Sequence, residues 1–193
     1  SRSTVPLMTG LTDSPSRTDS IQLPPDWMKD VVIRTLKESD LPALEWDGEY
    51  THFRKMYSDA CIRQQRGFSV LWLAELPGTG IIGQVFIQLI CDRHELADGL
   101  YRAYLYSFRI KPAFRSAGLG ARMLAALEAD LKRRRYTKLT LNVAKTNDRA
   151  RKMYERHGFR IVAHEPGCWS YIDHEGNWQQ VEEPAWRMEK TLR

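Results

Sequence analysis

The chain has 193 residues, 42% of them hydrophobic, which is enough for one domain with a substantial core. No apolar run approaches the roughly 18–20 residues that cross a bilayer, the first residues contain no signal-peptide stretch, and the three cysteines lie far apart without a C-x-x-C pair. We therefore expect a cytoplasmic protein without a membrane partner, a disulfide framework or a bound metal.

The N-terminal region divides into a polar segment and the start of a domain. Residues 1–28 are rich in Ser, Thr and Pro and show no hydrophobic periodicity, so we expect a flexible N-terminal arm followed by one domain over residues 29–193. Within the domain, residues 31–34 predict a first strand. Ser39 is expected to be the N-cap of a helix, and residues 50–66 predict a second helical stretch.

The middle of the chain predicts three strands and an amphipathic helix. Residues 68–76 and 81–91 are apolar and are joined by a Pro-Gly-Thr-Gly turn, which indicates a hairpin. Residues 101–110 form the next expected strand, and residues 118–134 the helix. The apolar residues at i, i+4 spacing on this helix, which we expect to face the core, are Leu119, Met123, Leu127 and Leu131.

The C-terminal third predicts a strand, a helix and a hairpin. Residues 139–143 form the strand and residues 148–157 the helix, which Asn147 or Thr146 is expected to cap and Gly158 to end. Residues 159–162 are expected to begin a final hairpin, with its turn at residues 173–177 and its returning strand at 186–192. The predicted order is therefore strand, two helices, three antiparallel strands, helix, strand, helix and two strands, a mixed α+β arrangement.

A glycine-rich turn, Arg115-Ser116-Ala117-Gly118-Leu119-Gly120, joins the third central strand to the amphipathic helix. The backbone N–H groups of such a turn and the positive end of the helix dipole can bind phosphate. The spacing excludes a P-loop, which needs four residues between its glycines and then Gly-Lys-Ser/Thr. It also fails the dinucleotide-binding G-x-G-x-x-G pattern, because position 123 is Met.

Positive charge is concentrated around this turn. Residues 109–160 contain 15 Lys and Arg against 4 Asp and Glu, a net charge of +11, whereas the whole chain carries only +5. Such a field would attract a polyphosphate ligand. For residues 132–135 the alternative is that four cations complement the C-terminal end of the helix dipole. Another alternative is a nucleic-acid-binding protein that uses residues 109–160, although no RNA-binding signature accompanies the charge.

The R-x-x-G-x-G pattern of residues 115–120, followed by Asn147, Tyr154 and Gly158-Phe159, resembles the GCN5-related N-acetyltransferase (GNAT) superfamily over about residues 31–193. The resemblance implies a mostly antiparallel twisted sheet that splays between its fourth and fifth strands and is flanked by helices. It implies acetyl-CoA as co-substrate and direct acetyl transfer to a primary amine in a ternary complex. The acceptor would be a small-molecule or peptide amine, nucleic acid is not an expected partner, and a homodimer is compatible with this reading.

The same resemblance assigns roles to residues. Backbone groups at Phe108 and Ile110 would hold the pantetheine arm, and Asn147 would hydrogen-bond to it. Tyr154 would donate a proton to the departing thiolate, since a phenol with a pKa of about 10 keeps its proton at neutral pH. The complete set of implied cofactor-binding residues is Phe108, Ile110, Arg115, Ser116, Ala117, Gly118, Leu119, Gly120, Ala121, Asn147, Arg149 and Tyr154.

Each of these roles has a structural alternative. Asn147 can serve as a helix N-cap alone, and Tyr154 can be a packing residue. Ala117 stands where most relatives carry a basic residue, so one side-chain contact to phosphate is absent. A non-catalytic acyl-CoA sensor would have the same fold.

The general base is not identified by the pattern. The position at which the histone-acetylating branch carries glutamate is Tyr104, which leaves Glu75, Glu95, another acid acting through water, or no dedicated base. The five histidines show no partner pattern, and we expect them to be exposed or packed. Three aromatic residues are expected either to shape the acceptor pocket or to pack the final hairpin: Trp169, Tyr171 and Trp178.

Overall fold

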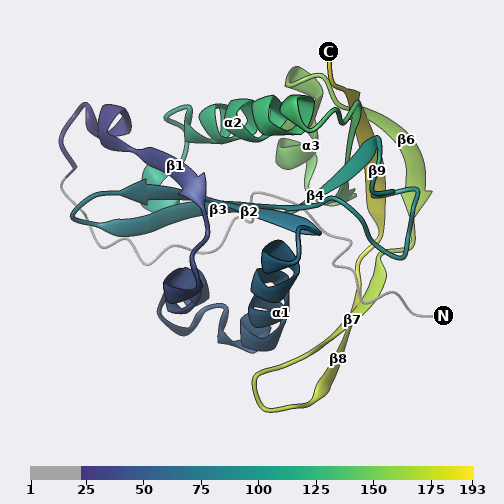
Figure 1. The fold of residues 1–193 in the computed structure, drawn as a ribbon, viewed down its shortest axis with the longest axis horizontal. Helices are drawn as coiled ribbons and strands as arrows, with labels where there is room; N and C mark the ends of the chain where they lie inside the picture. The colour runs from purple at the N-terminus through teal and green to yellow at the C-terminus, as the bar shows by residue number, and fades with distance from the viewer. Residues whose placement is uncertain (1–22) are drawn as a thin grey trace.

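The computed structural model describes residues 23–193, which form a seven-stranded sheet with helices on both faces (Figure 1). The strand order is β1-β2-β3-β4-β5-β9-β6, and every neighbouring pair is antiparallel except β4 and β5. Strands β7 and β8 make a separate two-stranded sheet. The expected mixed α+β fold is confirmed. The strand bounds are Val32–Thr35 (β1), Ser69–Leu76 (β2), Gly80–Gln88 (β3), Arg102–Ile110 (β4), Lys138–Ala144 (β5), Arg160–Glu165 (β6), Cys168–Ile172 (β7), Trp178–Glu182 (β8) and Ala185–Thr191 (β9).

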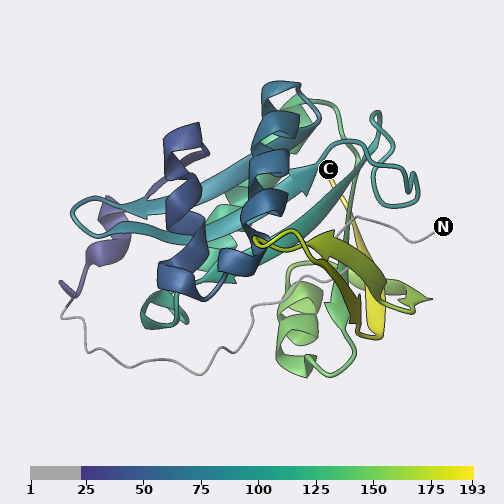
Figure 2. The same ribbon diagram turned by 90° about the horizontal axis from the view of Figure 1, so that it is seen from below.

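The helices form two layers on opposite faces of the sheet (Figures 1 and 2). One face carries α2 (Leu119–Arg133) and α3 (Asp148–Arg156). The other carries α1 (Arg54–Gln65) and the 3₁₀ helices η2 (Glu38–Gly48) and η3 (Thr51–Phe53). The β7–β8 hairpin extends on the α1 side. Within the described part of the chain, no helix is long and apolar enough to span a membrane.

Each layer buries a different kind of side chain against the sheet. The apolar row that the sequence predicts on α2 is at most 1% exposed, so its core role is confirmed. Each such side chain contributes about 1.5–3 kcal/mol relative to an exposed position. The α1 side is richer in aromatic residues. Its buried members include Trp46, Tyr50, Tyr57, Phe86, Tyr104, Tyr106 and Trp169.

The start of η2 differs from the expected Ser39 cap. Lys37 occupies the N-cap position, and its backbone N–H donates to the Asp40 carboxylate at 2.7 Å. The same carboxylate pairs with Arg34 at 2.8 Å. A carboxylate already oriented by an arginine is a stronger acceptor than a serine hydroxyl, so the helix begins two residues earlier than predicted.

The C-terminal hairpin also differs from expectation. β6 pairs directly with β9, but the turn at residues 173–177 lies between β7 and β8. Gly167 explains the departure from the main sheet. Its φ is +72°, and a Cβ at this position would lie 1.6 Å from the carbonyl oxygen of Glu183, so only glycine allows the two backbones to meet.

Of the predicted N-terminal arm, residues 1–28, the first 22 residues lie outside the described part of the chain. Its described end contacts the domain. Trp27 in η1 (Trp27–Asp30) meets Phe114 edge-on, with ring centroids 5.3 Å apart, and Arg122 of α2 donates to the Met28 carbonyl at 2.7 Å. Leu23 also packs against the core, so contacts with the core reach back to the first described residue.

Candidate active site

A slot opens in the sheet where β4 and β5 part. The two parallel strands pair only from Arg102 with Lys138 to Leu105 with Leu141. Beyond that point β4 stays with β3 and β5 stays with β9. Ser107 lies at the start of the parting in a β-bulge, with φ +53°, and its Oγ accepts a hydrogen bond from Gln84 Nε2 at 2.9 Å. Because a bulge bends its strand and increases its twist, it turns the end of β4 away from β5.

The glycine-rich turn lies at the end of β4 and leads into α2. Ser116 and Gly118 have φ values of +63° and +91°, which place successive backbone amides in a concave arrangement at the helix N-terminus. No atom lies within 4 Å of the position that a Cβ at Gly118 would occupy, so a ligand has free access to this backbone. Arg115 Nε donates to the Ile110 carbonyl at 2.8 Å and holds the turn against β4.

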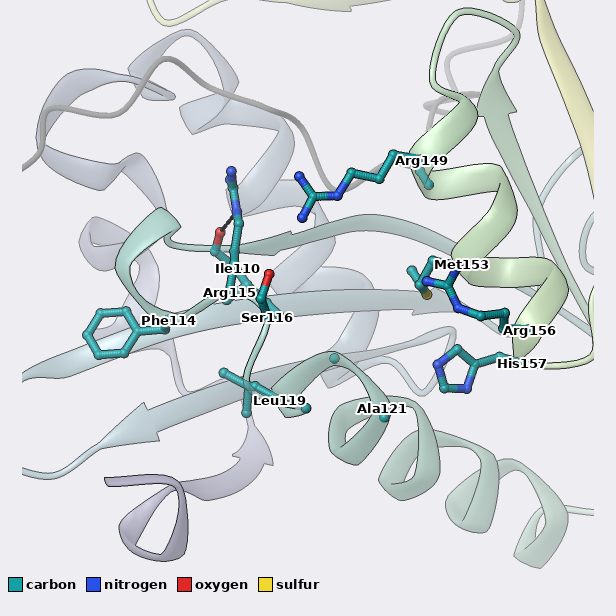
Figure 3. Close-up of a pocket in the computed structure, with 13 residues that line it drawn as sticks. Ile110, Phe114, Arg115, Ser116, Leu119, Ala121, Arg149, Met153, Arg156 and His157 are labelled. Carbon is teal, nitrogen blue, oxygen red and sulfur yellow. Dashed lines mark hydrogen bonds between the residues drawn. The ribbon is translucent and has the colours of Figure 1, made fainter. Parts of the chain in front are cut away.

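A cavity of about 330 Å³ extends from this turn to α3 (Figure 3). Arg149 projects from α3 toward the side of the cavity that holds Arg115 and Ser116, and Arg156 and His157 lie along the same helix. The cavity therefore combines a helix N-terminus with basic side chains, an arrangement suited to phosphate groups. The predicted residues that line it are Ile110, Arg115, Ser116, Gly118, Leu119, Gly120, Ala121 and Arg149.

Four of the predicted residues do not line this cavity. Phe108 is fully buried, and its ring lies 3.5 Å from the position of a Cβ at Gly120. Ala117 is exposed in the turn. Asn147 is the N-cap of α3, where its Oδ1 accepts the Ala150 N–H at 3.1 Å. The fourth, Tyr154, is fully buried.

Sequence reasoning missed five residues that line the cavity. Phe114 comes just before the turn, and the others lie on α3 or at its C-cap. Their spacing of three and four residues places them on one helix face together with Arg149, and this periodicity was the available signal. These four residues are Ala150, Met153 and Arg156 of α3 and the C-cap residue His157.

Tyr154 contributes a buried hydroxyl on α3. Its side chain is 0% exposed, its ring meets Phe159 edge-on at 5.6 Å, and its hydroxyl has no hydrogen-bond partner among residues 23–193. Burial raises the pKa of Tyr154 above its usual value, so the phenol keeps its proton at neutral pH. A buried donor without a partner is costly, which makes it a candidate to bind an acceptor atom of a ligand.

The acids considered as general bases are held by arginines. Glu75 lies on β2 and pairs with Arg34 at 2.6 Å. Glu95 pairs with Arg93 at 2.8 Å; against the opposing effect of burial, hydrogen bonds from its own amide and from Arg93 hold the pKa of Glu95 below its usual value. Tyr104 is fully buried on β4, and burial raises its pKa, so it is a poor proton acceptor.

His52 is one of the five histidines that the sequence predicts to be exposed or packed. It lies in the aromatic layer on the α1 side, with its ring centroid 4.1 Å from that of Phe53 and 6.1 Å from that of Tyr171. Burial lowers the pKa of His52, and the charge of Arg109 lowers it further. A neutral imidazole on this face can accept a proton, and no local sequence pattern marks it.

The basic residues at the C-terminal end of α2 are separate from the cavity. Arg134 and Arg133 pair with Asp130 at 2.8 and 3.6 Å. They lie near the far end of a 15-residue helix, about 20 Å along its axis from the glycine-rich turn. Their position agrees with the helix-end interpretation of residues 132–135.

Comparisons with known proteins agree with this geometry. The model of the Acetyltransferase (GNAT) family matches residues 33–159. A search of curated proteins finds no match. Among solved structures, the ribosomal-protein-S18-alanine N-acetyltransferase from Escherichia coli is 21% identical, with a TM-score of 0.61 over 84% of this chain and 94% of that one.

Two further solved structures have the same fold. Ard1 from Thermoplasma volcanium is 16% identical, with a TM-score of 0.65 over 85% of this chain and 99% of that one. Spermidine/spermine N-acetyltransferase SpeG from Vibrio cholerae is 20% identical, with a TM-score of 0.60 over 85% and 94%. The family match, the slot between β4 and β5 and the glycine-rich turn identify the chain as a member of the acetyltransferase (GNAT) family and thus as an acyltransferase.

Proposed function

We propose that this protein transfers an acetyl group from acetyl-CoA to a primary amine by direct attack within a ternary complex. The observation that carries the proposal is the position of the glycine-rich turn, which opens its amides and basic cavity directly beside the slot between β4 and β5. In this proposal the turn at Gly118 and Gly120 binds the pyrophosphate, and Arg115 and Arg149 add positive charge. The separated edge of β4 at Phe108 and Ile110 holds the pantetheine arm, so that the thioester reaches the slot.

The chemistry needs one bond formed and one broken. The neutral amine attacks the thioester carbonyl, a C–N bond forms, and the C–S bond breaks with its electron pair on sulfur. Tyr154 donates its proton to that thiolate, which would give its unpartnered hydroxyl a partner. The amine nitrogen loses a proton to solvent or to a base on the α1 side. Asn147 caps α3 and so orients the helix that carries Tyr154.

Structural neighbours act on different amines, so the fold alone leaves the acceptor open. The Escherichia coli neighbour is named for an alanine of ribosomal protein S18, and the Vibrio cholerae neighbour for spermidine and spermine. The acceptor of this protein must be inferred from its own residues on the α1 side.

The proposal is tested in two steps. At 100 times its dissociation constant, acetyl-CoA should stabilise the protein by about 2.7 kcal/mol and raise Tm by about 5–11 °C. Thiol release from acetyl-CoA over a panel of amines then distinguishes an enzyme from an acyl-CoA sensor, which would show the Tm shift without turnover. The absence of a shift at millimolar acetyl-CoA would contradict cofactor binding, and a salt-dependent gel shift with nucleic acid would favour the nucleic-acid alternative.

A further inference from the structure

A cation lies in an aromatic box on the α1 side of the slot. Arg109, on β4 two residues after the bulge, is 6% exposed. Its guanidinium carbon is 3.6 Å from the ring centroid of Tyr50. Three further rings, those of Trp46, Phe53 and Tyr57, lie at 5.8–5.9 Å. The four rings come from η2, η3, α1 and the two-residue link between η2 and η3.

This guanidinium has no carboxylate partner within residues 23–193. Its Nη2 donates to the hydroxyl of Tyr57, and to Ser107 Oγ at 3.2 Å. Its Nε is buried and has no hydrogen-bond partner. Aromatic faces stabilise a cation, but they offer no acceptor to the N–H groups in its plane. A buried arginine without an anion is unusual, because a buried charge is normally paired.

Other unused donors and a second cation surround Arg109. The indole N–H groups of Trp46 and Trp169 are buried and have no partner among residues 23–193. The ammonium of Lys111 lies 5.9 Å from the Trp46 ring centroid. Trp169 is one ring further, with its centroid 6.2 Å from that of Phe53. One buried acceptor without a partner among residues 23–193, the Oε1 of Gln84, lies across the β3–β4 ladder from Arg109, but an amide oxygen carries no negative charge. The cluster therefore has an excess of positive charge.

Several acidic side chains of the surrounding elements are exposed, Asp47, Glu49 and Asp59 among them, and two others are used elsewhere. Glu45 of η2 pairs with Arg54 at 2.8 Å. Asp173, in the turn of the β7–β8 hairpin, accepts the backbone N–H groups of Glu175 and Asn177. Neither carboxylate is left to neutralise Arg109. The missing acceptor is therefore expected from a ligand.

The box lies on the face of the sheet opposite the cavity that holds the glycine-rich turn. The cavity with the glycine-rich turn lies on the α2 and α3 side, whereas Arg109 faces the rings of the α1 side. An amine that attacks a thioester held from one side of the slot approaches from the other. Trp46 and Asp47 both adopt left-handed φ values, +47° and +54°. Two successive non-glycine residues in this region store backbone strain, as is common at ligand sites.

We infer that the acceptor is a small amino acid whose free carboxylate binds Arg109, with the amine directed into the slot. This inference rests on the proposed function and specifies its acceptor. A carboxylate would accept hydrogen bonds from the guanidinium and neutralise its charge, as paired arginine–carboxylate contacts do. A polyamine would bring only further positive charge to the box.

The test compares amino acids with their carboxamides as acceptors in a thiol-release assay. Methionine, phenylalanine and glutamine, each with its amide, form matched pairs that differ only at the carboxylate, and spermidine and a dipeptide complete the panel. We expect kcat/KM to be about 10- to 100-fold higher for the acid, the usual effect of a hydrogen bond to a charged group. The α-amino group of the amide has a lower pKa than that of the free amino acid, so more of the amide is in the neutral, nucleophilic form. A preference for the acid therefore cannot come from the ionisation of the amine.

The Arg109→Met variant tests whether the acid-to-amide preference depends on this side chain. The change should raise KM for the acid, leave KM for acetyl-CoA unaltered and abolish the acid-to-amide preference. Because it replaces an unpaired buried charge with an apolar chain of similar length, Tm should be unchanged or higher. Arg109→Lys should restore part of the preference. Arg63→Met is the matched control, because Arg63 is a half-buried arginine 5.7 Å from the Phe68 ring and outside the box, and it should keep the preference.

The outcomes separate the two proposals. Equal turnover of acids, amides and spermidine, or preference for the dipeptide, would overturn the inference while the acetyltransferase function stands. A preference that survives Arg109→Met would overturn it as well. No thiol release with any amine would overturn the proposed function, and the inference with it. Because the wild-type comparison is decisive by itself, the test does not depend on how the variants fold.

Discussion

Replacing Tyr154 with phenylalanine removes one oxygen atom that is fully buried and has no hydrogen-bond partner within residues 23–193. A buried hydroxyl without a partner costs about 1–3 kcal/mol of desolvation free energy. We expect the ligand-free Tyr154→Phe protein to be about 1 kcal/mol more stable than the wild type. For a chain of this length, Tm should rise by about 2–4 °C. The ring keeps its edge-on contact with Phe159, so packing is preserved.

The same substitution should impair turnover. Loss of the proton donor should lower kcat by about 10²- to 10⁴-fold when thiolate departure limits the rate, which corresponds to about 2.7–5.4 kcal/mol in the barrier. Affinity for acetyl-CoA should change little. Calorimetric unfolding without ligand and thiol release at saturating acetyl-CoA measure the two effects independently.

Tyr136→Phe is the matched control. Tyr136 is also buried, but its hydroxyl donates to the Leu89 carbonyl at 3.3 Å. Its removal should lower stability by about 1 kcal/mol, whereas Tyr154→Phe should raise it, and should leave kcat unaltered, whereas Tyr154→Phe should lower it. A lower Tm for Tyr154→Phe would contradict the claim that the Tyr154 hydroxyl has no hydrogen-bond partner in the ligand-free protein. An unchanged kcat on a verified acceptor would make Tyr154 a packing residue, and weaker acetyl-CoA binding with unchanged kcat would make it a binding residue.

Three further substitutions test other parts of the molecule. Gly118→Glu should abolish acetyl-CoA binding without unfolding the protein, because the added carboxylate repels phosphate in otherwise open space; Gly118→Ala carries the same strain at φ +91° and should still bind, so titration calorimetry of the pair separates charge from strain. Gly167→Ala should lower Tm and raise the acceptor KM with acetyl-CoA affinity unaltered, since its Cβ would lie 1.6 Å from a backbone oxygen and displace the hairpin; an unaltered acceptor KM would contradict this. Burial, then Arg109 and His174, hold the pKa of His52 below its usual value, so the unfolded chain takes up this proton first and stability falls as pH drops below about 6.5. His52→Gln should remove that part of the loss, and parallel Tm curves for variant and wild type from about pH 7.5 to 5.5 would argue against the reasoning.

Features that depend on neighbouring residues were predictable from the sequence. The glycine-rich turn occupies six consecutive positions, and the concave geometry that we propose binds phosphate follows from glycine at 118 and the helix that starts beside it. The buried row of α2 repeats every four residues. The capping role of Asn147 and the end of α3 at Gly158 likewise need only a few residues of context. Local backbone preferences and side-chain periodicity act over this range, so the order of strands and helices up to β6 and most of the cavity beside the glycine-rich turn could be anticipated.

Features that join distant segments were decided only by the tertiary structure. The separation of β7 and β8 from the main sheet depends on the approach of Gly167 to Glu183, which no turn pattern announces. The aromatic box joins rings at positions 46 to 57 to Arg109, and Trp169 lies a further 60 residues along the chain. Each ring alone resembles an ordinary core residue. Whether a buried cation has an anion beside it depends on which side chains the folded backbone brings within hydrogen-bond distance, and sequence spacing carries no information about that distance.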